Sequence, residues 1–315
     1  MRYGFGIDLG GTTVKMAYFS EDGCLLDKWE IPTVTKNAGA QILPDIAAAV
    51  KKYIADHKID KSALLGIGIG VPGPVNANGI VNKCHNLGWE QVDIENDLQA
   101  LTGFPVKAGN DASLAALGES WKGGGAGCDS MLFVTLGTGV GGGVVIDGKV
   151  IHGTHGAAGE IGHIVLNREE ELYCTCGKRG CVEQYCSATG IVRLAHKYLN
   201  EKQTPSTLRN KETFTCKDVF DAAAAQDPAA QEVLEQVYSY MGEFLADICN
   251  VIDPAAIVLG GGVSKAGAPL LDGAKRYFEK FVFHAISPVQ FSLATLGNDA
   301  GAYGAFKLIL DAKGD

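Results

Sequence analysis

The chain has 315 residues, of which 46% are hydrophobic and 20% are charged, so it is long enough to form two ordinary globular domains. Its formal net charge of −9 argues against a nucleic-acid surface, because such a surface needs clustered lysine and arginine residues. The uncharged stretch Met131–Ile146 contains five glycines and is too short to span a bilayer, so no membrane association is expected. The chain has nine cysteines, and its first residues lack the apolar segment of a signal peptide. Together these features predict a cytoplasmic protein whose cysteines are reduced and bind metal.

The first part of the chain alternates predicted strands and helices. We expect strands at 3–9, 13–20, 24–31, 64–71 and 106–108, and helices at 38–57, 90–102 and 112–121. A glycine turn joins the first two strands, and the dipeptide Asn110-Asp111 separates the last strand from the last helix.

The second part repeats the strand-and-glycine-turn pattern. We expect a strand at 131–136, a loop at 137–143, a return strand at 144–146 and a further strand at 256–259; helices are expected at 188–200, 216–225, 229–252 and 301–311. Residues 8–12 and 135–139 are each a strand end followed by a glycine turn. This similarity predicts a duplicated α/β domain, although two unrelated hairpins would give the same pattern. The expected domains are 1–118, completed by the C-terminal helix 299–315, and 119–298.

Three glycine turns, each after an apolar strand, favour nucleotide binding, because glycine lets backbone N–H groups approach phosphate oxygens. The first turn alone would be better explained as a simple hairpin. Asp8, at the end of the first strand, is placed to hold Mg²⁺ through water, and Lys15 supplies a further cation. The turn residues expected to bind the nucleotide are Gly10, Gly11, Thr12, Thr13, Gly137, Thr138, Gly139, Gly260, Gly261 and Gly262.

Asn110 and Asp111 permit two compatible interpretations. Either residue can cap the following helix, which contributes about 1 kcal/mol. Alternatively, Asp111 is a general base that accepts a proton from an attacking hydroxyl group.

A cluster of four metal-binding side chains is the most specific pattern in the sequence. His163, Cys174, Cys176 and Cys181 together form a Cys₃His set that suits tetrahedral zinc. Four protein ligands leave no open position on the metal, so a zinc ion here would be structural rather than catalytic. The alternative is a group of buried thiols without a metal.

These motifs resemble the ROK family of sugar kinases and related repressors. The most specific elements are Glu160-Ile-Gly-His163 and Cys174-x-Cys176-Gly-x-x-Gly-Cys181-x-Glu183. The resemblance implies an α/β, two-domain actin/hexokinase/Hsp70-like (ribonuclease H-like) fold with a zinc-binding loop. It implies Asp111 as the catalytic base, zinc on the Cys₃His set, and ATP phosphates on the first two glycine turns. The residues expected to bind the sugar are Gly73, Asn86, Asn110, Asp111, Glu160, His163 and Glu183.

Within the family, the segments Asn86–Trp89 and 109–112 are most similar to those of bacterial ATP-dependent glucokinases. The similarity implies phosphorylation of glucose at the 6-hydroxyl with Mg²⁺-ATP, in a homodimer or higher homo-oligomer. The alternative substrates are N-acetylglucosamine, N-acetylmannosamine, mannose and fructose. The sequence departs from the family at Thr13, where relatives often carry lysine.

Two other classes of protein share this fold. A sugar-responsive repressor would need a DNA-binding surface, which the acidic charge disfavours. An ATPase chaperone or filament protein would not need a zinc loop that orders a sugar.

Overall fold

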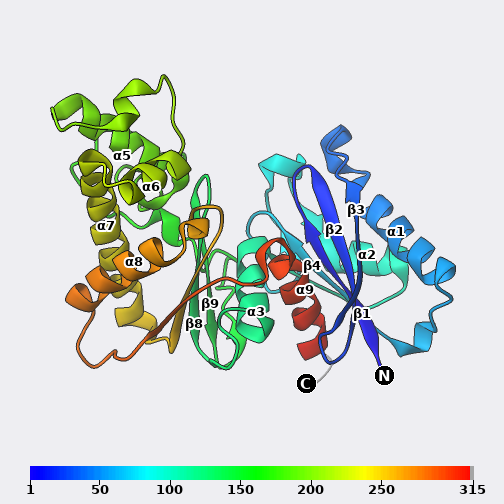
Figure 1. The fold of residues 1–315 in the computed structure, drawn as a ribbon. Helices are drawn as coiled ribbons and strands as arrows, with labels where there is room; N and C mark the ends of the chain where they lie inside the picture. The colour runs from blue at the N-terminus through cyan, green and yellow to red at the C-terminus, as the bar shows by residue number, and fades with distance from the viewer. Residues whose placement is uncertain (313–315) are drawn as a thin grey trace. The chain divides into compact units, whose positions relative to one another are not determined.

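The computed structural model describes residues 1–312 and contains two five-stranded sheets with helices packed against them (Figure 1). The first sheet has the strand order β3-β2-β1-β4-β7. Strand β1 pairs with β2 in the antiparallel and with β4 in the parallel direction, and β4 pairs with β7 in the parallel direction. The strands are β1 (Tyr3–Leu9), β2 (Thr13–Ser20), β3 (Leu25–Pro32), β4 (Leu64–Val71) and β7 (Val106–Asn110).

Two layers of helices bury the faces of this sheet. Helices α1 (Ile42–Asp56) and α2 (Ile94–Thr102) pack on the face that carries Phe5, Ile7 and Leu9. Helix α9 (Ala300–Asp311) packs on the other face, where glycines replace side chains. A Cβ atom added at Gly68 would lie 1.7 Å from the carbonyl oxygen of Ala305, so the helix backbone touches the sheet backbone.

The second sheet has the order β10-β9-β8-β11-β12. In both sheets the first strand along the chain occupies the centre, the next two extend the sheet on one side, and two later parallel strands extend it on the other. This shared topology supports the predicted duplication. The strands are β8 (Met131–Leu136), β9 (Val140–Ile146), β10 (Lys149–Val150), β11 (Ala256–Gly260) and β12 (Gln290–Leu293).

A small second type of sheet, further α-helices and short 3₁₀ helices complete the fold. A two-stranded sheet joins β5 (Ile80–Val81) to β6 (Val92–Asp93). The other α-helices are α3 (Asp111–Lys122), α4 (Glu183–Cys186), α5 (Ala188–Glu201), α6 (Cys216–Ala224), α7 (Pro228–Ile252) and α8 (Ala268–Phe281). Short 3₁₀ helices lie at Asn37–Gly39, Lys61–Ala63, His85–Leu87, Ile161–His163, Thr207–Asn210, Val263–Ala266 and Gly297–Asp299.

The chain forms two compact units. The first unit contains Met1–Asp129, Gly143–Gly159 and residues 295–312, and the second contains Ser130–Gly142 and Glu160–Ala294. Residues 313–315 of the predicted C-terminal helix lie outside the described residues. None of the helices among residues 1–312 is both long and apolar enough to cross a membrane.

Several predictions of secondary structure were wrong or incomplete. Helix α1 begins at Ile42, whereas the helix was predicted from residue 38. Residues 140–143, predicted as loop, belong to β9, and a Cβ atom at Gly143 would lie 2.4 Å from Cβ of Ala116. Gly143 therefore allows close packing within a strand instead of forming a loop. Residues 90–93 precede α2 and include strand β6 rather than a helical turn. Helices α4 and α8 and strands β5, β10 and β12 were not predicted.

Candidate active site

The first glycine turn links β1 to β2 and is held from both sides. The Gly10 amide donates to the carbonyl of Thr13 at 3.0 Å, and the Thr33 hydroxyl donates to the carbonyl of Gly10 at 2.7 Å. Gly11 is exposed, and a Cβ atom added there would meet only the side chain of Asn86, at 4.0 Å. The fold therefore places Asn86, predicted to bind sugar, beside a turn predicted to bind phosphate.

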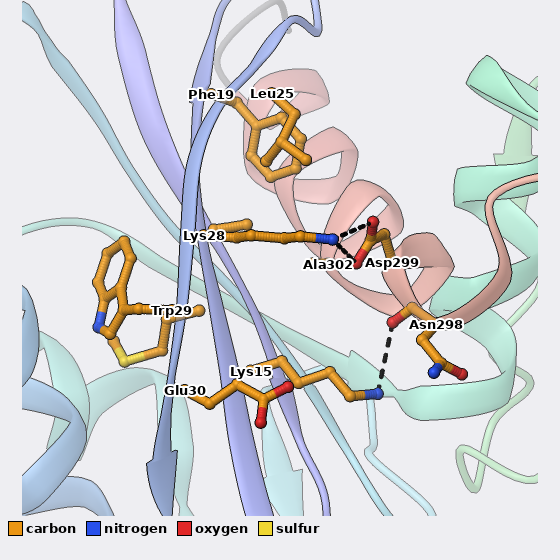
Figure 2. Close-up of a pocket in the computed structure, with 11 residues that line it drawn as sticks. Lys15, Phe19, Leu25, Lys28, Trp29, Glu30, Asn298, Asp299 and Ala302 are labelled. Atoms are coloured by element: carbon orange, nitrogen blue, oxygen red, sulfur yellow. Dashed lines mark hydrogen bonds and ion pairs between the residues drawn. The ribbon is translucent and has the colours of Figure 1, made fainter.

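Asp8 and Lys15 form an ion pair next to this turn. Lys15 Nζ lies 3.1 Å from Asp8 Oδ2 and also donates to the carbonyl of Asn298 at 3.4 Å. Figure 2 shows the Lys15 side chain reaching Asn298 at the edge of a cavity of about 320 Å³, beside the ion pair of Lys28 with Asp299. The ammonium group of Lys15 thus fixes the carboxylate of Asp8 and the segment that precedes α9.

Asn110 and Asp111 lie where β7 meets α3, and their amide and carboxylate groups are bonded to each other. Asn110 Oδ1 caps the helix by accepting the Ser113 amide at 3.0 Å, while its Nδ2 donates to Asp111 Oδ1 at 3.0 Å. The Ala112 amide also donates to Asp111 Oδ1, at 2.7 Å. Two donors therefore fix the orientation of a partly buried carboxylate at the first residue of α3.

The turn around Gly73 contributes to the same cluster. Asn110 Nδ2 donates a second hydrogen bond to the Gly73 carbonyl at 3.1 Å, and Gly73 has a positive φ of 92°. Burial raises the pKa of the Cys84 thiol, and the nearby carboxylate of Asp111 raises it further. The first unit therefore brings together Gly73, Asn110 and Asp111, with Cys84 close to them.

The second unit contains the other two glycine turns, which lie side by side. Gly261 follows β11 with a φ of 82°, and a Cβ atom there would lie 2.5 Å from the carbonyl oxygen of Leu136. Leu136 directly precedes the turn Gly137–Gly139. At Gly137 and Gly262 an added Cβ would meet no atom within 4 Å. Both turns therefore leave open space in which a ligand could approach the backbone.

A cavity that the sequence did not predict lies beyond the third turn. Its volume is about 670 Å³, and its wall includes Lys265 and Ala266, which follow Gly260–Gly262, together with residues of α6, α7 and α8. Helix α8 was not predicted from the sequence. The sequence therefore gave no indication that residues of α6, α7 and α8 enclose a cavity.

Glu183 connects the second glycine turn to the cysteine cluster. Its Oε2 accepts the Val140 amide at 3.2 Å and lies 2.1 Å from where a Cβ atom of Gly139 would stand. Its Oε1 accepts the Thr175 hydroxyl at 3.3 Å and lies 3.7 Å from the sulfur of Cys174. Glu183 is therefore partly engaged within its own unit.

The four predicted metal ligands converge. The Nδ1 of His163 and the sulfurs of Cys174, Cys176 and Cys181 all lie within 4.8 Å of one another. The sulfur of Cys174 is 3.6 Å from Nδ1 of His163, and the sulfurs of Cys176 and Cys181 are 3.6 Å apart.

These separations have the size of a zinc tetrahedron. With Zn–S bonds of about 2.3 Å and Zn–N bonds of about 2.0–2.1 Å, the tetrahedral edges are about 3.8 Å for S···S and about 3.5 Å for S···N. The donor set and its spacing therefore fit the metal.

The imidazole of His163 has two neighbours of different kinds. Its Nδ1 faces the cysteines, whereas its Nε2 lies 3.9 Å from Glu160 Oε2. The Glu160 side chain is 54% exposed, so it is available to a ligand from solvent. The second unit thus brings Glu160 and Glu183, both predicted to bind sugar, to the cysteine cluster.

Comparison with known proteins identifies the family to which the chain belongs. A model of the ROK family matches residues 4–312, and the chain belongs to that family. It is 44% identical over 313 residues to a glucokinase of Halalkalibacterium halodurans, covering 98% of this chain and 95% of that protein. It is 31% identical to an N-acetyl-D-glucosamine kinase of Aliivibrio salmonicida, covering 97% and 98% of the two chains.

A solved structure shows the same fold. The chain matches a ROK family glucokinase from Streptomyces griseus in complex with glucose and AMPPNP, with a TM-score of 0.73 and 32% identity. The match covers 97% of this chain and 98% of that one.

Proposed function

We propose that this protein is an ATP-dependent glucokinase that transfers the γ-phosphoryl group of ATP to the 6-hydroxyl of glucose. The observation that carries the proposal is the fixed carboxylate of Asp111 at the start of α3, in a chain with near full-length similarity to glucokinases. A carboxylate held by an amide side chain and a backbone N–H is pre-organised to accept a proton.

In the proposed reaction, the 6-hydroxyl oxygen of glucose attacks the γ-phosphorus of ATP. A bond forms between that oxygen and phosphorus as the bond to the β,γ-bridging oxygen breaks, and ADP leaves. Asp111 accepts the hydroxyl proton, while Asn110 holds Asp111 Oδ1 in place. Catalysis of this kind depends on positioning and on charge stabilisation, which suits a site with a fixed base and several backbone donors.

The glycine turns supply the groups that would hold the nucleotide. Backbone N–H groups at Gly10–Thr13 and Gly137–Gly139 would bind phosphate oxygens, and the Gly260–Gly262 turn would approach the nucleoside. The cavity of about 670 Å³ next to Lys265 is large enough for a nucleoside and is our proposed place for it.

Mg²⁺ bound with the nucleotide would neutralise charge on the transferring phosphoryl group. Asp8 offers one carboxylate, and Mg²⁺ commonly binds through one or two carboxylates while it keeps several waters. Lys15 holds that carboxylate in place.

A structural zinc ion on His163, Cys174, Cys176 and Cys181 completes the proposed site. Zinc would orient the imidazole through Nδ1 and leave Nε2 toward Glu160 and the sugar. Glu160, Glu183 and His163 would then accept or donate hydrogen bonds to sugar hydroxyls.

The choice of glucose over an N-acetylated hexose is the finer part of the proposal. It rests on the higher identity to a glucokinase than to an N-acetylglucosamine kinase. Mannose and fructose remain alternative substrates. The homodimer and the cytoplasmic location stay predictions, as does the division into domains at 118/119 and 298/299.

Replacing Asp111 tests the assignment of the base. Asp111→Asn is expected to lower kcat by about 10²–10⁴, while glucose still binds in equilibrium dialysis. Asp97→Asn, an exposed change on α2, is a control that should keep full activity. Retention of kcat within about tenfold in Asp111→Asn would contradict the assignment.

A further inference from the structure

Glu119 is a buried carboxylate on α3 that binds three backbone amides. Its exposed fraction is 0%. Oε1 accepts the amide of Leu296 at 2.9 Å, and Oε2 accepts the amides of Gly124 at 2.8 Å and Thr295 at 3.0 Å. These donors replace the water that a carboxylate loses on burial, so the group is committed to the segments that it binds.

The three amides lie within the first unit, close in sequence to two places where the chain passes to and from the second unit. Gly124 lies just after α3, where the chain leaves the first unit toward Ser130, and Thr295 and Leu296 lie where it returns after Ala294. These are two of the four points at which the chain passes between the units. One side chain therefore joins an outgoing and a returning segment.

The segment that leaves α3 is rich in glycine and is hydrogen-bonded to Glu119. Residues 123–125 are three consecutive glycines, the residue type with the widest range of backbone conformations. The amides of Gly123 and Gly125 both donate to the carbonyl oxygen of Glu119, at 3.1 and 3.0 Å. Glu119 thus holds the start of this glycine segment through its backbone carbonyl and its carboxylate together.

Glu119 also lies on the helix that begins with Asp111. Helices α3 and α9 touch backbone to backbone, since a Cβ atom at Gly118 would lie 2.3 Å from the carbonyl oxygen of Ala300 (Figure 1). The returning segment leads directly into α9. Glu119, which binds both segments, therefore lies on the same helix, α3, that positions the proposed base Asp111.

We propose that Glu119 is a positioning residue that fixes the pivot about which the two units move when sugar binds. The proposal rests on the proposed kinase function, because a phosphoryl transfer that excludes water requires the units to close. With the carboxylate in place, the two segments turn about one point that is fixed relative to Asp111. Without it, the glycine segment and the returning segment move independently, and closure no longer leads to one geometry.

Glu119→Gln tests the proposal with little change of shape. Glutamine has one acceptor oxygen, so its amide nitrogen would face backbone donors on one side. We measure the radius of gyration by small-angle X-ray scattering with and without saturating glucose, together with kcat and KM for glucose. Glu119→Asp, which keeps the charge but is one methylene shorter, is the second variant if Glu119→Gln folds poorly.

Asp227→Asn is the matched control. Asp227 is also a buried carboxylate that accepts backbone amides, from Thr207 and Ala230, but these residues of the second unit are far in sequence from the points where the chain passes between the units. Both substitutions remove an acceptor from buried N–H groups, so both should lower the denaturation midpoint. Only a change at the pivot should alter the response to glucose.

We expect Glu119 variants to show a smaller glucose-induced decrease in the radius of gyration than the wild type, with kcat/KM lowered about tenfold or more. Asp227→Asn should respond like the wild type. A wild-type response and kcat/KM in Glu119→Gln would overturn the proposal, as would equal effects of both substitutions. Absence of compaction in a wild type that phosphorylates glucose would also overturn it and leave the kinase function standing. Absence of phosphorylation in the wild type would refute the kinase function itself.

Discussion

The backbone contact between α3 and α9 predicts a large effect from one methyl group. A Cβ atom at Gly304 would lie 1.6 Å from the carbonyl oxygen of Leu114, whereas ordinary contacts begin near 3.4 Å. Gly304→Ala must therefore push the helices apart by about 1.8 Å at this point, the difference between those two distances.

The net cost follows from two opposing terms. Alanine gains about 1 kcal/mol over glycine in helix propensity. Overpacking against a backbone carbonyl costs about 3 kcal/mol, the upper end for inserted methyl groups. We expect a net loss of about 2 kcal/mol in the free energy of unfolding.

Activity should fall as well, because α3 begins with Asp111. A displacement of about 1 Å at a reacting group can reduce the rate about 10²-fold, so we expect kcat to fall by about 10–10². The assays are urea denaturation followed by circular dichroism, and steady-state phosphorylation of glucose. Asp97→Asn, an exposed change on α2, is the control and should lie within about 0.5 kcal/mol of the wild type. Wild-type stability and kcat in Gly304→Ala would refute the reasoning.

Three further predictions concern other parts of the site and its support. Metal analysis of purified protein should find about one equivalent of zinc per chain, and Cys176→Ala should lose it and weaken glucose binding; unchanged affinity would count against the role of the metal. Lys15→Met should raise KM for Mg²⁺-ATP more than KM for glucose, because it releases the Asp8 carboxylate. Equal changes in the two KM values would argue against a role of Asp8 and Lys15 in binding Mg²⁺-ATP. Asp227→Asn should cost about 2 kcal/mol at neutral pH, since hydrogen bonds from Ala230 and Thr207 outweigh burial and hold the pKa of Asp227 below its usual value. That contribution is present above the unfolded pKa of about 3.9 and is lost as the pH falls through the folded pKa, so the difference between the two proteins should shrink in acid. A difference that is independent of pH would contradict this.

The sequence predicted those parts of the molecule that depend on neighbouring residues. Strands 3–9, 13–20, 64–71 and 131–136 were predicted with their observed bounds, because apolar residues and glycine turns delimit them locally. The convergence of His163 with the three cysteines was also predicted, since short spacing brings such residues together.

What the sequence did not predict depends on contacts between distant residues. The glycines of β9 resembled a loop, and only the close contact of Gly143 with α3 shows why the strand needs a glycine there. The links from Glu119 to residues 295–296 join positions far apart in the chain, and no local pattern signals them. The cavity beside Lys265 likewise needs helices α6, α7 and α8 to be placed together.

The most direct test of the central claim is a comparison of kcat/KM for several hexoses with Mg²⁺-ATP. Purified wild-type protein is assayed for sugar phosphate formation with glucose, mannose, fructose, N-acetylglucosamine and N-acetylmannosamine, and for ATP hydrolysis without sugar. We expect the highest kcat/KM for glucose and little ATP turnover in its absence. A higher kcat/KM for an N-acetylated sugar would contradict the choice of glucose, and equal ATP turnover without sugar would contradict the kinase itself.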